Sequence, residues 1–348
     1  MAQGTVVFDC ERMKHANSGL FYFCSQLGKA LLEEANGEED IAFYVPSKLK
    51  GYFGEKARYK ILTPLHKLFL PTFGTRVWHA TYQTTAYMPA PCCKTNVILT
   101  VHDLNFLYEK GKEKHEHYIK ELQRNVDRSD VVVAISKYAQ RDLEAHIDIK
   151  GKPVHVIYNG CNVYKGAIEA PAVKPANPFL FTIGMVLAKK NFHVLPRLLE
   201  GNDYELVIAG RQSDYSNRII EEACRCGVLG RVHLVGAISD ENKYWYLNNC
   251  EAFVFPSIAE GFGLPVIEAM SCGKPVFLSQ YTSLPEIGSD KAYYFNKDFD
   301  GEGMRSELEA GLNDFKQRNR AEEIRQYAAK FSWKEAARLY LSLYNSLL

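Results

Sequence analysis

The sequence predicts an α/β protein made of two doubly wound domains. Short apolar or aromatic runs recur along its 348 residues, and each is followed by a longer segment with helical periodicity. Runs such as 131–135 are apolar throughout, which is typical of strands covered on both faces in a parallel sheet. The length also suits two domains better than one. Two parallel sheets, each carrying helices on both faces, fit these observations best.

The expected strands alternate with helical stretches along both halves of the chain. In the first half the expected strands are 5–9, 41–45, 76–80, 97–103, 131–136 and 154–158, and the expected helices include 19–34 and 114–127. In the second half the expected strands are 179–184, 205–210, 232–236, 252–256, 276–279 and 292–295. Ligands of open α/β sheets bind at the carboxyl ends of the strands, so functional residues are expected in the loops that follow them.

A proline-containing segment separates the two halves. Residues 163–178 show neither strand nor helix periodicity, and this composition is typical of a linker. We therefore expect one domain over residues 1–162 and a second over 179–330. Residues 331–348 are expected to form a helix that packs back towards the N-terminal domain.

Composition excludes several classes of protein. The net charge of +1 lacks the basic excess of a nucleic-acid binder. The nine cysteines lack the spacing of a zinc site or a disulfide framework. No N-terminal secretion signal is evident, and no apolar run approaches the ~20 residues of a membrane-spanning helix. We expect a cytoplasmic protein with reduced thiols.

The strongest motif spans residues 252–276. It combines a strand, a glycine-containing loop and a helix that opens at Pro265. The amides of Phe262, Gly263 and Leu264 are expected at the helix N-terminus, which is an anion site suited to a diphosphate. Gly261 and Gly263 allow a ligand to approach the backbone closely. The motif therefore predicts a site for a phosphate-bearing ligand.

Two carboxylates flank this loop. Glu260 lies in the loop, where it can accept hydrogen bonds from sugar hydroxyls. Glu268 lies about one turn inside the helix, where it can reach further hydroxyls, such as those of a ribose. The alternative is that Glu260 only charges a surface loop and that Glu268 stabilises the helix dipole. The combination of both carboxylates with the glycine loop favours the binding interpretation.

This segment resembles the donor-site signature of the family-4 retaining glycosyltransferases. Members of that family adopt the GT-B fold, in which two Rossmann-like domains enclose a cleft. Residues 283–286 resemble the family's next loop, and residues 331–333 its last-helix signature. Residues 156–160 resemble the end of the first domain, although Tyr158 stands where proline is usual. The resemblance implies an acceptor-side domain over 1–162 and a donor-binding domain over 179–330.

The resemblance also implies roles for residues outside the main motif. It places Gly19 and Gly184 at the donor, and it assigns Lys190 to the leaving diphosphate. Many members carry an arginine where this chain has Met185, and Arg211 is a candidate to replace that charge. A solvated surface lysine is the alternative for Lys190.

Two further residues complete the candidate site. Ser257, in the main motif, is expected to bind the donor. His102 ends an apolar strand and is expected to contact the donor sugar or to orient the acceptor. The alternative for His102 is a core histidine hydrogen-bonded to the backbone. We predict His102, Glu260 and Lys190 as catalytic residues.

The implied reaction is a retaining, metal-independent hexosyl transfer of the mannosyltransferase type. The donor would be a nucleotide sugar such as GDP-mannose or UDP-glucose, which is a substrate, so no cofactor is expected. The acceptor would be a glycan or lipid-linked precursor in cell-surface polysaccharide synthesis. The acidic segment 298–300 and the histidines of 115–117 are not expected to bind a metal, because the first is a surface loop and the second point to different helix faces.

Other readings of the same architecture stay open. A nucleotide-sugar epimerase would act without an acceptor, and a phosphorylase with a pyridoxal cofactor would need a longer chain. A dinucleotide-dependent oxidoreductase would need a G-x-G-x-x-G after the first strand, which this sequence lacks. A sugar-nucleotide-binding module that has lost its chemistry is the non-enzymatic alternative.

One stretch of the first domain is basic and aromatic. Seven lysines and arginines fall between residues 48 and 76, interleaved with tyrosines and phenylalanines, and Glu55 is the only acid among them. Such a stretch suits a peripheral contact with anionic lipid headgroups or a phosphorylated acceptor. A solvated loop and helix face is the alternative.

Overall fold

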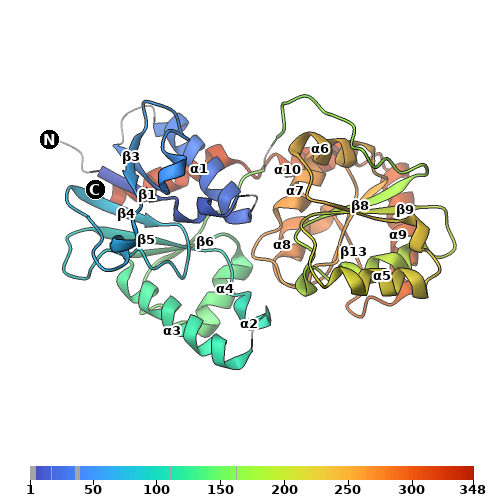
Figure 1. The fold of residues 1–348 in the computed structure, drawn as a ribbon, viewed down its shortest axis with the longest axis horizontal. Helices are drawn as coiled ribbons and strands as arrows, with labels where there is room; N and C mark the ends of the chain where they lie inside the picture. Colours follow the sequence, from blue (N-terminus) through green and yellow to red (C-terminus); the bar gives the residue numbers. More distant parts are fainter. Residues whose placement is uncertain (1–4, 17, 36–39, 110, 162) are drawn as a thin grey trace. The chain divides into compact units, whose positions relative to one another are not determined.

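The computed structural model describes residues 5–16, 18–35, 40–109, 111–161 and 163–348, and it divides into two compact units. The first unit comprises residues 1–160 and 331–348, and the second comprises residues 161–330 (Figure 1). The chain thus leaves the first unit, builds the second and returns to the first.

The first unit contains a parallel sheet of seven strands in the order β3-β2-β1-β4-β5-β6-β7. Its strands are β1 (Thr5–Asp9), β2 (Ile41–Val45), β3 (Arg58–Ile61), β4 (Thr75–Ala80), β5 (Asn96–Val101), β6 (Val131–Ala134) and β7 (Val154–Val156). Its helices are α1 (Gly19–Ala35), α2 (Phe106–Glu109), α3 (Lys112–Arg128), α4 (Lys137–His146) and α11 (Trp333–Leu347). Short 3₁₀ helices occur at Glu11–Lys14, Ser47–Leu49 and Pro64–Lys67.

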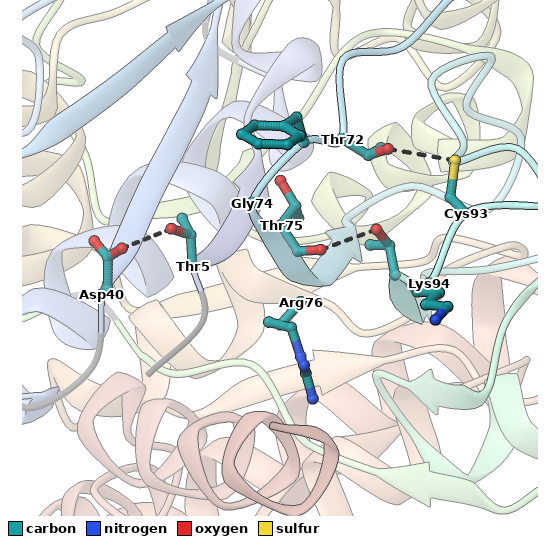
Figure 2. A pocket seen from close by; sticks show the side chains of 10 residues that line it. Thr5, Asp40, Thr72, Gly74, Thr75, Arg76, Cys93 and Lys94 are labelled. Atoms are coloured by element: carbon teal, nitrogen blue, oxygen red, sulfur yellow. Dashed lines mark hydrogen bonds between the residues drawn. The ribbon is translucent and has the colours of Figure 1, made fainter. Parts of the chain in front are cut away.

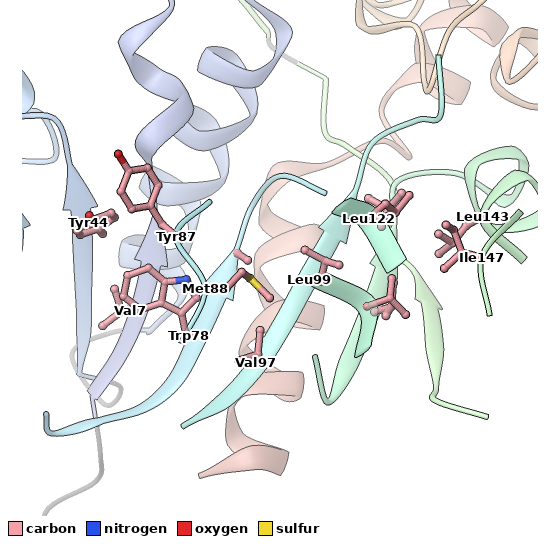
Figure 3. Close-up of a cluster of buried hydrophobic side chains, with 14 of the residues drawn as sticks. Val7, Tyr44, Trp78, Tyr87, Met88, Val97, Leu99, Leu122, Leu143 and Ile147 are labelled. Atoms are coloured by element: carbon pink, nitrogen blue, oxygen red, sulfur yellow. The ribbon is translucent and has the colours of Figure 1, made fainter. Parts of the chain in front are cut away.

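Alternate residues of these strands face two separate helical layers. One face forms a buried cluster in which Trp78 and Leu99 of the sheet meet Leu122 of α3 and Leu143 of α4 (Figure 3). The other face is covered by α1 and α11, which pack side by side. Burial on both faces explains why the central strands carry consecutive buried apolar residues, as at positions 6–8, 97–99 and 131–134.

Buried hydrogen bonds attach α11 to the sheet. The ring of His79 lies between the hydroxyls of Tyr344 and Thr100, at 2.7 and 2.8 Å, and Thr100 lies 3.0 Å from the hydroxyl of Tyr340. Burial lowers the pKa of His79 to about 3, so its ring is neutral at physiological pH. The last helix is therefore an integral layer of the first unit.

The second unit contains a parallel sheet of six strands in the order β10-β9-β8-β11-β12-β13. Its strands are β8 (Phe179–Ile183), β9 (Glu205–Ala209), β10 (Val232–Gly236), β11 (Ala252–Phe255), β12 (Val276–Leu278) and β13 (Tyr293–Tyr294). Its helices are α5 (Ser216–Arg225), α6 (Asp240–Asn249), α7 (Leu264–Ser271), α8 (Leu284–Gly288), α9 (Gly301–Gln317) and α10 (Ala321–Ala328). Its 3₁₀ helices are Ala188–Lys190, Phe192–Leu199, Leu229–Arg231 and Ser289–Lys291.

Both sheets reverse their strand order at one position. In the first unit the reversal falls between β1 and β4, and in the second it falls between β8 and β11. Loops on the two sides of such a switch point diverge, which leaves a crevice outside the carboxyl ends of the strands. The residues that follow these four strands are therefore the first to inspect for function.

The predicted fold class of doubly wound α/β domains is confirmed, but several element bounds differ. β3 was not predicted, because it is an edge strand whose sequence alternates charged residues with Tyr59 and Ile61. The strand expected over 154–158 ends at Val156, and the one expected over 292–295 contains only Tyr293 and Tyr294. None of the helices in the described ranges has the length and apolar composition needed to cross a membrane.

Candidate functional site

The switch point of the second unit carries a buried ion pair. Lys190 ends the 3₁₀ helix that follows β8, and Glu260 lies in the loop that follows β11. The Nζ of Lys190 lies 2.5 Å from Oε1 of Glu260, and each side chain is only 12% exposed. The two residues predicted to contact diphosphate and sugar are thus brought together across the switch point.

Neighbouring groups hold this pair in place. The hydroxyl of Ser257 donates to the same Oε1 of Glu260 at 2.6 Å, and the ammonium of Lys190 lies 4.9 Å from the ring centroid of Phe255. The amide of Ile258 donates to the carbonyl of Lys189 at 2.8 Å, which ties the two loops together. The surface-lysine alternative does not describe Lys190, because its side chain is largely buried.

The turn before α7 has its carbonyls fixed on one side. The hydroxyl of Ser283 lies 3.0 Å from the carbonyl oxygens of Glu260 and Phe262. In a trans peptide the carbonyl and the following N–H point in opposite directions. The amides of Gly261 and Gly263 are therefore directed away from Ser283. The backbone of this turn thus presents a face rich in N–H groups.

Gly263 is the residue that caps α7. Its φ of +110° lies in the left-handed region, and an added Cβ would lie 3.0 Å from Leu284. Gly261, Phe262 and Gly263 are buried, whereas Leu264 and Pro265 are partly exposed. The predicted helix with proline in its first turn is observed, and the phosphate role of its amides stays a prediction.

A second close backbone approach follows β8 and β9. Gly210 has a φ of +132°, and an added Cβ would lie only 1.9 Å from the carbonyl oxygen of Gly184. Gly184 in turn lies beside the side chain of Lys190, whose Cε would be 3.4 Å from an added Cβ. Gly210 was not among the predicted site residues, although a glycine at the end of a strand is a signal for such an approach.

Arg211, the candidate to supply the positive charge that is missing at Met185, has an exposed side chain. The carbonyl of Arg211 accepts from the amide of Val186 at 3.0 Å, and Met185, 48% exposed, lies in the same loop. The backbone of Arg211, which follows β9, is therefore hydrogen-bonded to the loop that follows β8 at the switch point. A role for its guanidinium in place of the arginine missing at Met185 stays a prediction.

Glu268 is buried inside α7 and is paired with a lysine that the sequence did not indicate. Lys243 of α6 lies 3.2 Å from Oε1 of Glu268 and 2.9 Å from Oδ1 of Asp240. Burial alone would lower the pKa of Lys243, but these two carboxylates raise it above its usual value. Lys243 is therefore charged, and it fixes the position of the Glu268 carboxylate.

The other two predicted site residues, His102 and Gly19, belong to the first unit. Nε2 of His102 donates to the carbonyl of Thr81 at 2.8 Å, and its ring contacts Phe23 edge-on. Burial lowers the pKa of His102 to about 4, so the ring is neutral. This is the contact of the backbone-bonded alternative, and because Nε2 carries the proton, Nδ1 is the acceptor nitrogen. Gly19 is exposed at the start of α1.

The switch point of the first unit carries groups of another kind. Asp9 ends β1 in a fully buried position, where its Oδ1 accepts from the amide of Glu11 at 2.9 Å. Burial raises the pKa of Asp9 to about 8. The hydrogen bond from the Glu11 amide and the charge of Arg12 oppose this rise, whereas the negative charge of the Glu11 side chain adds to it. The guanidinium of Arg12 stacks on Tyr82, 3.8 Å from the ring centroid.

The two sequence patterns considered for metals lie in helical contexts. Asp300 caps α9 by accepting from the amide of Gly303 at 2.7 Å, and residues 115–117 lie within α3. Within the described ranges of the chain, no group of three or more histidine, cysteine or acidic side chains is arranged to hold a metal ion.

The fold and the site together define a class of protein. It has two doubly wound α/β domains, and one of them carries a largely buried lysine–carboxylate pair at its switch point. Residues 167–330 match the family model described as "Glycosyl transferases group 1", and residues 20–165 match "Glycosyltransferase Family 4". The chain belongs to the glycosyltransferase family, with one of these domains in each unit.

Several relatives of this chain carry mannosyltransferase names. The chain is 29% identical over 289 residues to the "Serotype-specific mannosyltransferase WbdA" of Escherichia coli, an alignment that covers 76% of this chain and 35% of that protein. It is 23% identical over 316 residues to the "O-antigen chain mannosyltransferase RfbU" of Salmonella typhimurium, covering 84% and 87% of the two chains. This chain thus spans about a third of the length of the Escherichia coli relative.

Solved structures share the whole fold. A glycosyltransferase from Rickettsia africae superposes with a TM-score of 0.74 at 15% identity and covers 100% of this chain and 99% of its own. The Anabaena protein HepE, solved in complex with UDP and glucose, gives a TM-score of 0.71 at 13% identity, with 99% and 100% coverage. The predicted GT-B fold is confirmed by these neighbours.

Proposed function

We propose that this protein is a retaining, metal-independent hexosyltransferase that uses a GDP-mannose or UDP-glucose type of donor. The acceptor is a glycan or lipid-linked precursor in cell-surface polysaccharide synthesis. The observation that carries the proposal is the Lys190–Glu260 pair at the switch point, beside the N-terminus of α7. The names of the mannosyltransferase relatives support the class of sugar.

The donor diphosphate is proposed to bind beside Lys190 and the turn before α7. The lysine supplies a positive charge with little exposure to solvent. The Ser283 hydroxyl binds the carbonyls of Glu260 and Phe262, so the amides of Gly261 and Gly263 point away from Ser283. Both contributions favour an anion, and they favour it more as charge grows on the leaving group.

Glu260 and Glu268 are proposed to bind hydroxyls of the two sugars of the donor. When the donor is bound, Lys190 contacts both the diphosphate and Glu260. The Glu260 carboxylate then accepts hydrogen bonds from the hydroxyls of the donor hexose. Glu268, held by Lys243, accepts from the ribose. Glu260→Ala is expected to lower turnover chiefly by mispositioning the hexose relative to the diphosphate.

The transfer is proposed to occur on one face of the sugar. The bond between the anomeric carbon and the diphosphate oxygen breaks, and the acceptor oxygen forms the new bond on the same face. The acceptor proton passes to the departing phosphate oxygen, so no carboxylate nucleophile is needed beneath the anomeric carbon. A neutral His102 is proposed to orient the donor sugar or the acceptor through hydrogen bonds.

A thermal-shift panel of nucleotides and nucleotide sugars tests the donor. A ligand that binds the native state at 100 times its Kd stabilises it by about 2.7 kcal/mol, so the true donor is expected to raise Tm by several degrees. GDP or UDP compounds should give the largest shifts, and the shifts should shrink in Lys190→Ala. The absence of a shift with every nucleotide sugar, or a shift with NAD alone, would refute the proposal.

Product analysis then separates transfer from its alternatives. With donor and an acceptor glycan, we expect a new glycosidic bond and one free nucleoside diphosphate per bond formed. Release of an isomerised nucleotide sugar in a donor-only incubation would identify an epimerase. Donor binding without turnover on a panel of polysaccharide precursors would indicate a binding module.

A further inference from the structure

The positive charge of the protein is concentrated in one part of the first unit. Residues 41–101 contain eight lysines and arginines and one acid, which gives +7, whereas the whole chain carries +1. The remaining residues therefore sum to −6. The net charge of the chain does not show this uneven distribution. One segment of a nearly neutral protein is strongly basic.

The same segment exposes large apolar side chains. Between β3 and β4, the exposed fractions are 73% for Leu65, 91% for Leu68, 79% for Phe69 and 101% for Phe73. Among the described residues, these four are the most exposed large apolar side chains, and they fall within nine residues. We call these four residues the apolar wedge. Single exposed apolar residues are common on proteins, but a group of this size marks an interaction surface.

Contacts on the inner side of this stretch hold the apolar wedge outward. Leu62 and Leu70, which alternate with its members along the chain, pack against the buried core of the unit. A hydrogen bond of 2.9 Å joins His66 Nδ1 to the hydroxyl of Tyr44 in β2, and the hydroxyl of Thr72 donates to the sulfur of Cys93 at 3.3 Å. The exposure of the wedge is thus a property of an anchored segment.

One member of the apolar wedge, Phe73, lines a hollow of about 600 Å³. Figure 2 shows the residues around this hollow. Phe73 lines it together with Arg76 and Lys94, and Thr5 and Thr75 place it at the amino ends of β1 and β4. The hollow is thus lined by two cations, by several hydroxyls and by the carboxylate of Asp40, which forms an ion pair with Arg58. The hollow lies at the end of the sheet opposite to Asp9 and His102, which occupy strand carboxyl ends.

We infer that the apolar wedge and the cations around it form a docking surface for an anionic phospholipid bilayer. Leucine and phenylalanine side chains suit the boundary between headgroups and acyl chains, and lysines suit the phosphates above it. A nucleic acid would use the charge but would leave Leu65 and Leu68 in water. The inference concerns a surface of the first unit and stands independently of the proposed donor site.

Vesicle co-sedimentation of the full chain tests the docking surface. We expect binding to vesicles of phosphatidylcholine with about a third phosphatidylglycerol, and at least ~10-fold weaker binding to pure phosphatidylcholine, because the cations contribute only on the anionic surface. Replacing Leu68, Phe69 and Phe73 together by serine should weaken binding by at least ~10-fold, given the apolar area withdrawn from the bilayer. Lys67→Gln and Lys94→Gln should each weaken it about fivefold.

The matched control replaces Ile220 and Leu229, exposed apolar residues of the second unit, by serine. This variant should bind vesicles as the unchanged protein does, and all variants should retain their Tm and their nucleotide-induced thermal shift. Equal vesicle binding by the wedge variant and the control, or no binding to anionic vesicles, would overturn the inference. So would a dimer in sedimentation velocity that the wedge substitutions dissociate, since the occupant would then be a second copy.

Discussion

The two switch points of this protein have the same topology but differ in the charge of their buried groups. In the second unit, Lys190 and Glu260 form an ion pair between the loops that follow β8 and β11. In the first unit, burial favours the neutral forms of Asp9 and His102, with a raised pKa for the acid and a lowered pKa for the histidine. Parallel sheets therefore provide a crevice in both units, but the side chains decide what each crevice can bind.

The difference fits the separate tasks that the proposed function gives to the two units. A diphosphate needs positive charge at a site of low exposure, which the second unit provides through Lys190. The first unit instead combines the neutral Asp9 and His102 with the ion pair of Glu11 and Arg12, and this mixture suits hydrogen bonds to hydroxyl-rich molecules. The second unit also contains a second buried ion pair, which is formed by Lys243 and Glu268.

The strongest way to break this comparison is to remove the charge at the second switch point. Lys190→Ala should lower turnover by roughly 10²–10³, the usual effect of losing one preorganised group that stabilises a developing negative charge. The measurement is kcat with the donor identified by thermal shift.

Lys189→Ala is the matched control, because the residue is adjacent and takes part in the site through its backbone carbonyl. Its turnover should stay within about twofold of the unchanged protein. A folded Lys190→Ala variant with the turnover of this control would remove the diphosphate role.

Breaking the second ion pair should destabilise the second unit. Lys243→Met leaves Glu268 buried without its cation, which is expected to cost about 3 kcal/mol of unfolding free energy. Denaturant unfolding measures the loss, and Lys243→Arg should recover part of it. If instead Lys243→Met unfolds like the unchanged protein, Glu268 does not depend on Lys243 for its charge.

The raised pKa of Asp9 at the first switch point should make the stability of the protein depend on pH. Because the folded protein raises the pKa of Asp9 to about 8, the native state holds a proton that the unfolded chain has lost above its ordinary value near 3.8. Stability from this group is therefore full at low pH and is lost as pH rises towards 8, by up to ~1.4 kcal/mol per pH unit.

Asp9→Asn should remove this dependence. The difference in unfolding free energy between variant and unchanged protein is expected to grow between pH 6 and 8, whereas the exposed Asp203→Asn should show no such trend. A constant difference across this range would mean that Asp9 is ionised in the folded protein.

The smallest expected effect concerns the turn before α7. Ser283→Ala frees the carbonyls of Glu260 and Phe262 and loosens the orientation of the amides that follow them. Nucleoside diphosphate affinity should fall about fivefold, in line with the ~1 kcal/mol of a typical hydrogen bond. Calorimetry with GDP and UDP measures the change, and an unaltered affinity would show that the turn keeps its geometry without Ser283.

The sequence predicted the elements whose signals are local. The central strands contain continuous apolar runs because both faces of the sheets are covered, and the proline, glycines and carboxylates of residues 252–276 lie in one continuous segment. β3 escaped because edge strands keep charged residues, and Lys243 escaped because its partner Glu268 is 25 residues away in another helix. Pairings of this kind depend on helix packing, which no local pattern encodes.

Calorimetric titration of GDP and UDP into the unchanged protein, Lys190→Ala and Lys189→Ala tests the central claim most directly. A diphosphate held at the charged switch point predicts a Kd at least ~10-fold weaker in Lys190→Ala, with Lys189→Ala close to the unchanged protein. Equal Kd values for the three proteins, with all of them folded, would contradict the claim.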